Sequence, residues 1–174
     1  MKYLAKFVLL AFIYLSCAYA NAEQKTVILD LNYLLNKSKA GKDAQDFLKK
    51  SFENNAKKFK DQEKDLKKEE TDLLSQKSSL SKEDYEKKSD KLRKKVIKYQ
   101  SDRRVSLEKI ATLRTNSRNT LIKKTEEILN DYIKSNDISL VVDKKMTLGG
   151  NPDLDITDVI VKKLNKELLS LNLK

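Results

Sequence analysis

The chain has 174 residues, with 37 Lys and Arg against 26 Asp and Glu, and it contains no His, no Trp, one Cys and three Gly. A catalytic or metal centre built on histidine is therefore excluded, and three glycines are too few for a phosphate-binding loop, which needs several at fixed spacing. Because 36% of the residues are charged and only 7% are aromatic, little apolar material is left for one compact core.

The N-terminal residues have the three parts of a secretory signal. Two lysines precede an unbroken apolar run at 7–15, and small residues follow around Ala20 and Ala22. This pattern predicts a leader over residues 1–22 that is cleaved after one of these two alanines. The apolar run is shorter than the roughly 20 residues of a membrane-spanning helix, so we expect export rather than anchoring.

The only cysteine, Cys17, lies within this leader. A lone cysteine can form neither an intramolecular disulfide nor a cysteine-based metal cluster. Lipid attachment at Cys17 is a weaker alternative to simple cleavage, because Tyr14 stands where such a site requires an aliphatic residue. We therefore expect the mature protein to contain no thiol.

The mature chain is expected to begin with a short strand that leads into a long helical segment. Residues 26–31 read T-V-I-L-D-L, which is typical of a buried strand. Residues 38–135 contain no proline and one glycine, so almost nothing interrupts a helix there. Their middle, 76–84, is polar, and Ser81 followed by Asp84 is typical of a helix cap. We therefore predict a hairpin arm of two helices over 38–135, with the turn near 76–84.

Apolar residues repeat every seven positions along both predicted helices, as in a coiled-coil seam. The companion positions three and four residues further on are mostly polar, so the seam is about one apolar residue wide. Such a seam can zip two helices together but cannot bury a wide core. The predicted seam residues are Phe52, Phe59, Leu66, Leu73 and Leu80 in the first helix and Tyr85, Leu92 and Tyr99 in the second.

The excess positive charge lies on the hairpin. Residues 38–135 hold 27 basic and 18 acidic side chains, a net charge of +9, whereas the rest of the mature chain holds 8 of each. Within the hairpin, residues 91–124 carry twelve basic and two acidic side chains. A solvated face would be served by mixed signs, so this one-sided charge favours an acidic partner. The basic residues of this stretch are Lys91, Arg93, Lys94, Lys95, Lys98, Arg103, Arg104, Lys109, Arg114, Arg118, Lys123 and Lys124.

The C-terminal elements are short. Residues 138–143 and 146–148 predict two further strands, and an amphipathic helix is expected from about Asp155, after a Gly-Gly-Asn-Pro breaker. Three short strands bury too little area for a stable sheet, so we expect residues 23–37 and 136–174 to form a β body that further copies complete. The residues expected in the core of this body are Val27, Leu29, Leu31, Ile138, Leu140 and Val142.

Three segments together resemble the Skp/OmpH family of periplasmic chaperones. They read V-I-L-D-L-N-Y-L-L at 27–35, I-S-L-V-V-D-K at 138–144 and D-I-T-D-V-I-V-K-K-L-N-K at 155–166, and a long charged hairpin separates the first two. The resemblance implies an α+β fold and a jellyfish-like homotrimer, in which coiled-coil tentacles surround a cavity. It also implies a periplasmic protein that holds unfolded outer-membrane β-barrel proteins without ATP, with no catalytic residues, cofactor or metal.

Two other classes of function stay open at this point. A structural or adaptor coiled coil of the cell envelope would have one fixed partner, and a basic coiled coil can bind nucleic acid through its phosphates. The leader makes nucleic acid an incidental partner, whereas an anionic lipid or lipopolysaccharide surface stays open as a further one. An enzyme is the least favoured class, because the acidic residues lie in regular charged helices without an apolar pocket to shift a pKa.

Overall fold

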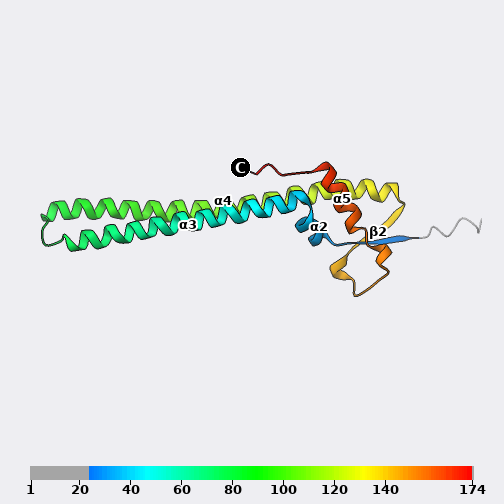
Figure 1. Cartoon of the computed structure of the whole chain (residues 1–174), viewed down its shortest axis with the longest axis horizontal. Helices are drawn as coiled ribbons and strands as arrows, with labels where there is room; N and C mark the ends of the chain where they lie inside the picture. Colours follow the sequence, from blue (N-terminus) through cyan, green and yellow to red (C-terminus); the bar gives the residue numbers. More distant parts are fainter. Residues whose placement is uncertain (1–23, 174) are drawn as a thin grey trace, which may run out of the picture.

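The computed structural model describes residues 24–173, so the predicted leader and its cleavage sites lie outside the described residues. Figure 1 shows a long hairpin of two helices that projects from a small body made of the remaining elements. The predicted fold class, α+β with one long helical hairpin in the chain, is confirmed. No helix within residues 24–173 combines the length and the apolar composition that a membrane span requires.

The hairpin consists of α3 (Lys39–Ser75) and α4 (Lys82–Ser135), which pack against each other along the length of α3 (Figure 1). Ser81 caps α4, as the sequence predicts. Its hydroxyl accepts a hydrogen bond from the amide of Asp84 at 3.1 Å and donates one to the carboxylate of the same residue at 2.7 Å. Ser38 caps α3 in the same manner, with its hydroxyl 3.2 Å from the amide of Gly41. Both helices therefore begin at a side-chain cap.

The seam is narrow, and Phe59 is its best-buried aromatic residue. Phe59 is 5% exposed, and its ring contacts that of Tyr99 edge to face with the centroids 6.0 Å apart. The other predicted seam residues are half-buried, with one exception. Phe52 is 54% exposed and does not contribute to the seam. A straight helix turns by about 20° per seven residues relative to a strict heptad, and near the base Leu48 is buried and Asn55 half-buried instead.

The body contains a two-stranded parallel sheet. In this sheet β1 (Lys25–Leu29) pairs with β2 (Ile138–Asp143), although the whole hairpin lies between them in sequence. The chain leaves β1 two residues earlier than predicted, because the carboxylate of Asp30 accepts a hydrogen bond from the amide of Tyr33 at 2.8 Å and starts a helix. This helix, α2 (Leu31–Lys37), was not predicted. Leu31 therefore belongs to α2 and not to a strand.

The predicted strand at 146–148 is wrong. The carboxylate of Asp143 accepts a hydrogen bond from the amide of Lys145 at 3.0 Å, which turns the chain into a 3-10 helix, η1 (Lys144–Met146). A loop with a second 3-10 helix, η2 (Pro152–Leu154), then leads to α5 (Thr157–Glu167). The amide of Ile156 donates to the carbonyl of Ile28 at 2.9 Å, so the loop returns beside β1. The expected helix near Asp155 thus begins two residues later.

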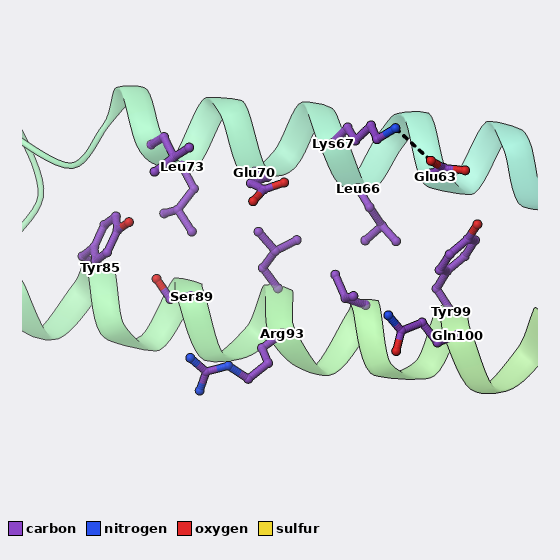
Figure 2. Close-up of a pocket in the computed structure, with 13 residues that line it drawn as sticks. Glu63, Leu66, Lys67, Glu70, Leu73, Tyr85, Ser89, Arg93, Tyr99 and Gln100 are labelled. Carbon is purple, nitrogen blue, oxygen red and sulfur yellow. Dashed lines mark hydrogen bonds and ion pairs between the residues drawn. The ribbon is translucent and has the colours of Figure 1, made fainter.

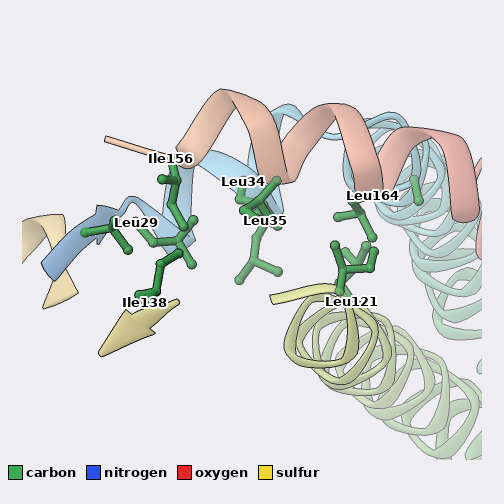
Figure 3. Packing of buried hydrophobic residues seen from close by; sticks show 11 residues of the cluster. Leu29, Leu34, Leu35, Leu121, Ile138, Ile156 and Leu164 are labelled. Atoms are coloured by element: carbon green, nitrogen blue, oxygen red, sulfur yellow. The ribbon is translucent and has the colours of Figure 1, made fainter. Parts of the chain in front are cut away.

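One apolar cluster joins the body to the base of the arm. Leu34 of α2 and Ile160 and Leu164 of α5 are fully buried in it, and Figure 3 shows Leu164 facing Leu121 of α4. Among the six predicted core residues the degree of burial differs. Val27, Leu29 and Ile138 are buried, Leu31 and Val142 are half-buried, and Leu140 is 55% exposed. Leu140 is therefore outside the core of the single chain.

Candidate functional site

The twelve basic residues of 91–124 all lie on α4, and the structure divides them into two groups. Five form ion pairs of 2.5–3.8 Å with acidic residues: Arg93, Lys95, Lys98, Arg104 and Lys124. The other seven have no ion pair within residues 24–173: Lys91, Lys94, Arg103, Lys109, Arg114, Arg118 and Lys123. These seven side chains carry the positive charge of residues 91–124 that no ion pair compensates within the described residues, and their role in binding stays a prediction.

Two of the ion pairs hold helices together. Lys95 of α4 donates to both carboxylate oxygens of Glu69 in α3, at 2.5 and 2.7 Å. At the base of the arm, Lys124 lies 2.9 Å from the carboxylate of Glu167 in α5 and 3.2 Å from that of Glu127. Hydrogen bonds to Glu167 and Glu127 raise the pKa of Lys124. Lys95 and Lys124 therefore have structural partners within the chain.

One side of the hairpin has an apolar groove of about 470 Å³ between α3 and α4. Leu66 and Leu73 of α3 point into it, and Figure 2 shows Tyr85 and Tyr99 of α4 at its two ends. The groove exists because the seam is only one apolar residue wide, so the side chains beside it leave space. It is large enough to accept apolar side chains of another molecule.

The rim of this groove is charged. Lys67 donates a hydrogen bond to the carboxylate of Glu63 at 2.8 Å. This hydrogen bond and the positive charge of Lys67 lower the pKa of Glu63, and the same contact raises the pKa of Lys67. Both side chains are exposed, so the pair adds little to stability. The groove thus combines an apolar floor with ionised groups at its edge.

A smaller groove of about 190 Å³ continues from the first one toward the base of the arm, because Glu63 and Tyr99 line both. Its lining also includes Phe52, Arg103 and Leu107. The aromatic ring that the heptad pattern assigned to the seam is therefore part of an open surface. It lies in the same groove as one of the arginines without an ion pair.

The seam has a polar interruption next to these grooves. Gln62 lies three residues after Phe59, and its side-chain oxygen is buried without a hydrogen-bond partner within residues 24–173. A buried carbonyl group that lacks a partner costs about 1–3 kcal/mol. The seam is therefore polar at Gln62, one turn from the buried ring of Phe59.

The arm also exposes large apolar side chains that the seam does not use. They are Phe52, Leu74, Ile97, Val105 and Leu107. Sequence reasoning did not single out the last four, although each lies outside the seven-residue register of the seam, which is the signal that could have found them. An isolated exposed apolar residue is ordinary. Five of them on one narrow hairpin, beside unpaired cations, give a surface that can bind apolar and acidic groups together.

The body has a wider hollow, of about 730 Å³, which is lined by the loop before α5 and by Asp30, Asp155 and Asp158. Lys144 donates to the carboxylate of Asp155 at 2.6 Å. Burial alone would raise the pKa of Asp155, but hydrogen bonds from Lys144 and Thr157 outweigh burial and hold the pKa below its usual value. Within residues 24–173 no cluster of three or more Asp, Glu, Cys or His residues could hold a metal ion.

Comparison with known proteins gives a family and a fold. A family model described as "Outer membrane protein (OmpH-like)" matches residues 25–164. None of the curated proteins matches the chain. Among solved structures, the chain is similar to a crystal structure from Caulobacter crescentus, which is described as a "putative outer membrane chaperone (OmpH-like)". The TM-score is 0.80 and the sequence identity is 17%, and the match covers 89% of this chain and 92% of the other. At this identity the similarity shows a shared fold. Because the family match extends from β1 into α5, the chain belongs to the OmpH-like family.

Proposed function

We propose that this protein is a periplasmic chaperone that holds unfolded outer-membrane β-barrel proteins without ATP. The observation that carries this proposal is the surface of the arm, where basic side chains without an ion pair among residues 24–173 and exposed apolar side chains lie on the same helix. An unfolded chain offers both carboxylates and unburied apolar groups, so such a surface binds it without requiring one sequence. Membership of the OmpH-like family and the description of the Caulobacter crescentus chain support the same role.

We further propose that three copies assemble through the body. Within the described residues the sheet has two strands, and β2 has no partner on its outer edge. Leu140 on β2 is exposed in the single chain, as are Met146 at the end of η1 and Leu148 in the loop after it. Further copies would cover these side chains and the strand edge. In this proposal 23–37 and 136–174 form the assembly body, and 38–135 is the arm.

The mechanism is capture by many weak contacts. Carboxylates of the unfolded barrel are attracted to the cations of α4 that have no ion pair in the described part of the chain, and its aromatic and aliphatic side chains enter the grooves of the hairpin. Each contact is weak alone, and together they compete with aggregation. When the barrel folds, its apolar side chains are withdrawn, so the chaperone releases it without a nucleotide.

Light scattering tests this proposal directly. Two unrelated urea-denatured outer-membrane barrels are each diluted into buffer, with or without a molar excess of the purified protein. We expect suppressed aggregation of both barrels and no complex with either barrel once it is folded. Unchanged scattering at excess protein would refute the chaperone function. Suppression of one barrel only would indicate a dedicated partner and not a general holding activity.

A further inference from the structure

We infer that the arm has a client-binding side, formed by arginine and apolar side chains of α4, and a separate lysine side that stays in water. This inference rests on the proposed function and narrows it to one face of the helix. Residues at spacings of three and four share one face of a helix. The arginine stripe defined in this way consists of Arg93, Ile97, Gln100, Arg104, Leu107, Ala111, Arg114 and Arg118.

The two kinds of cation are segregated on α4. All five arginines of the chain lie on this helix, four of them on the arginine stripe, and the fifth, Arg103, adjoins it. A second face, the lysine stripe, carries no arginine. It consists of Lys87, Lys91, Lys94, Lys98, Ser101, Val105 and Lys109. Solubility alone gives no reason to keep the two cations apart.

The grooves of the hairpin lie on the arginine side. Arg93 and Gln100 line the larger groove, which is the one in Figure 2, and Arg103 and Leu107 line the smaller one that continues from it. The hollow on the other side of the seam has a different lining. It is bordered mainly by charged side chains, namely Glu69, Asp72, Lys88, Lys91 and Lys95, with Leu73, Gln76 and Leu92.

The exposed apolar side chains show the same division. Ile97 and Leu107, which are 59% and 43% exposed, belong to the arginine stripe itself. Phe52 and Leu74 of α3 line the smaller and the larger groove. Val105 is the only one of the five exposed apolar residues of the arm that lies on the lysine stripe. Cations, apolar side chains and open grooves therefore coincide on one side.

The chemistry of this side fits an extended segment of unfolded polypeptide in which aromatic residues stand near carboxylates. A guanidinium group is planar and weakly hydrated, so it can pair with a carboxylate through two hydrogen bonds and can also stack on an aromatic ring. A lysine ammonium group keeps its water more firmly. The client's aromatic side chains would fill the grooves, and its carboxylates would meet Arg103, Arg114 and Arg118, which have no ion pair within residues 24–173.

Two charge-matched variants test the inference. Arg103→Gln, Arg114→Gln and Arg118→Gln together remove three unpaired charges from the arginine side, and Lys94→Gln, Lys109→Gln and Lys123→Gln remove three unpaired charges from elsewhere on α4. Affinity for a fluorescent urea-denatured barrel should fall by about tenfold in the arginine variant, because three exposed guanidinium contacts are lost. It should fall by less than about threefold in the lysine variant. Equal losses would overturn the inference while leaving the chaperone function intact, and a wild-type protein that binds no barrel would overturn both.

Adjacent positions allow a second test that does not depend on charge. Gln100 lies on the arginine stripe and Ser101 on the lysine stripe, and both are exposed. The mature chain is expected to contain no thiol, so Gln100→Cys and Ser101→Cys in it each give a unique attachment point for a photo-crosslinker. The label at 100 should crosslink the denatured barrel several times more efficiently than the label at 101. Equal yields would refute a sided surface, and crosslinks at 100 between copies of this chain without client would assign the grooves to a neighbouring arm instead.

Discussion

Phe52 and Phe59 lie seven residues apart, and replacing each by alanine distinguishes a seam residue from a residue of the open surface. Phe59→Ala removes a ring that is 5% exposed and that packs edge to face on Tyr99. Large-to-small changes at buried phenylalanines cost about 3–5 kcal/mol, and the narrow seam places the cost near the lower end. Phe52 keeps 54% of its surface in water, so Phe52→Ala should cost only about 1 kcal/mol, roughly half of what full burial contributes.

Hydrogen exchange of arm peptides measures this difference. At tenfold per 1.4 kcal/mol, Phe59→Ala should speed exchange around the middle of α3 by about 100-fold, and Phe52→Ala should speed it by about fivefold. Retention of unfolded barrels should be weakened more by Phe52→Ala than by Phe59→Ala. Of the two rings, only that of Phe52 is exposed to a client. Equal exchange rates in the two variants would refute the assignment of Phe59 to the seam and of Phe52 to the surface.

Three further predictions concern the body and the arm. Leu140 is exposed in the single chain, so Leu140→Asp should leave the subunit folded but dissociate the oligomer in sedimentation. Val27→Asp should instead unfold the body, because it buries an unpaired charge. A trimeric Leu140→Asp protein would contradict the proposed interface. Residues 60–73 and 85–98 face each other across the seam, and deleting both should shorten the arm by about 20 Å. The oligomer should persist, but suppression of barrel aggregation in light scattering should weaken. Full suppression would place client binding in the body. The pKa of Asp155 is lower in the folded protein than in the unfolded chain, so the ionised side chain stabilises the fold. This stabilisation is fully present above the usual pKa of an aspartate and is lost as the pH falls through the lowered pKa of the folded protein. The melting temperatures of wild type and Asp155→Asn should therefore converge on acidification, and a constant difference would argue against this linkage.

The hairpin could be predicted because its signals are local. A long stretch without breakers, a seven-residue apolar repeat and the cap at Ser81 each act within a few residues, and they agree with one another. The end of β1 was predicted less well, because the local signal there is ambiguous. The sequence Asp30-Leu31-Asn32-Tyr33 is compatible with the end of a strand or with the start of a helix, and the hydrogen bond from the Tyr33 amide to Asp30 selects the helix.

Features that depend on a second element could not be predicted from one sequence. Phe52 and Phe59 occupy the same position of the repeat, and only the placement of α4 shows that one is exposed. Met146 and Leu148 have the composition of a strand, but the turn at Asp143 leaves them in solvent. Similarly, the spacing of the arginines can be read from the sequence, whereas the side on which the grooves lie requires the position of α3.

The parallel pairing of β1 and β2 has a consequence for the order in which the protein folds. The two strands are separated by residues 30–137, and closing a flexible loop of roughly 100 residues costs about 4 kcal/mol of chain entropy. A hairpin that zips from its capped tip makes each new contact close to the previous one, so it advances by short-range steps. By the time it reaches its base, β2 is held beside β1. We therefore expect the arm to deliver the second strand to the first during folding. Loss of the Ser81 hydroxyl should slow formation of the body, although Ser81 lies more than 50 residues from either strand in the sequence.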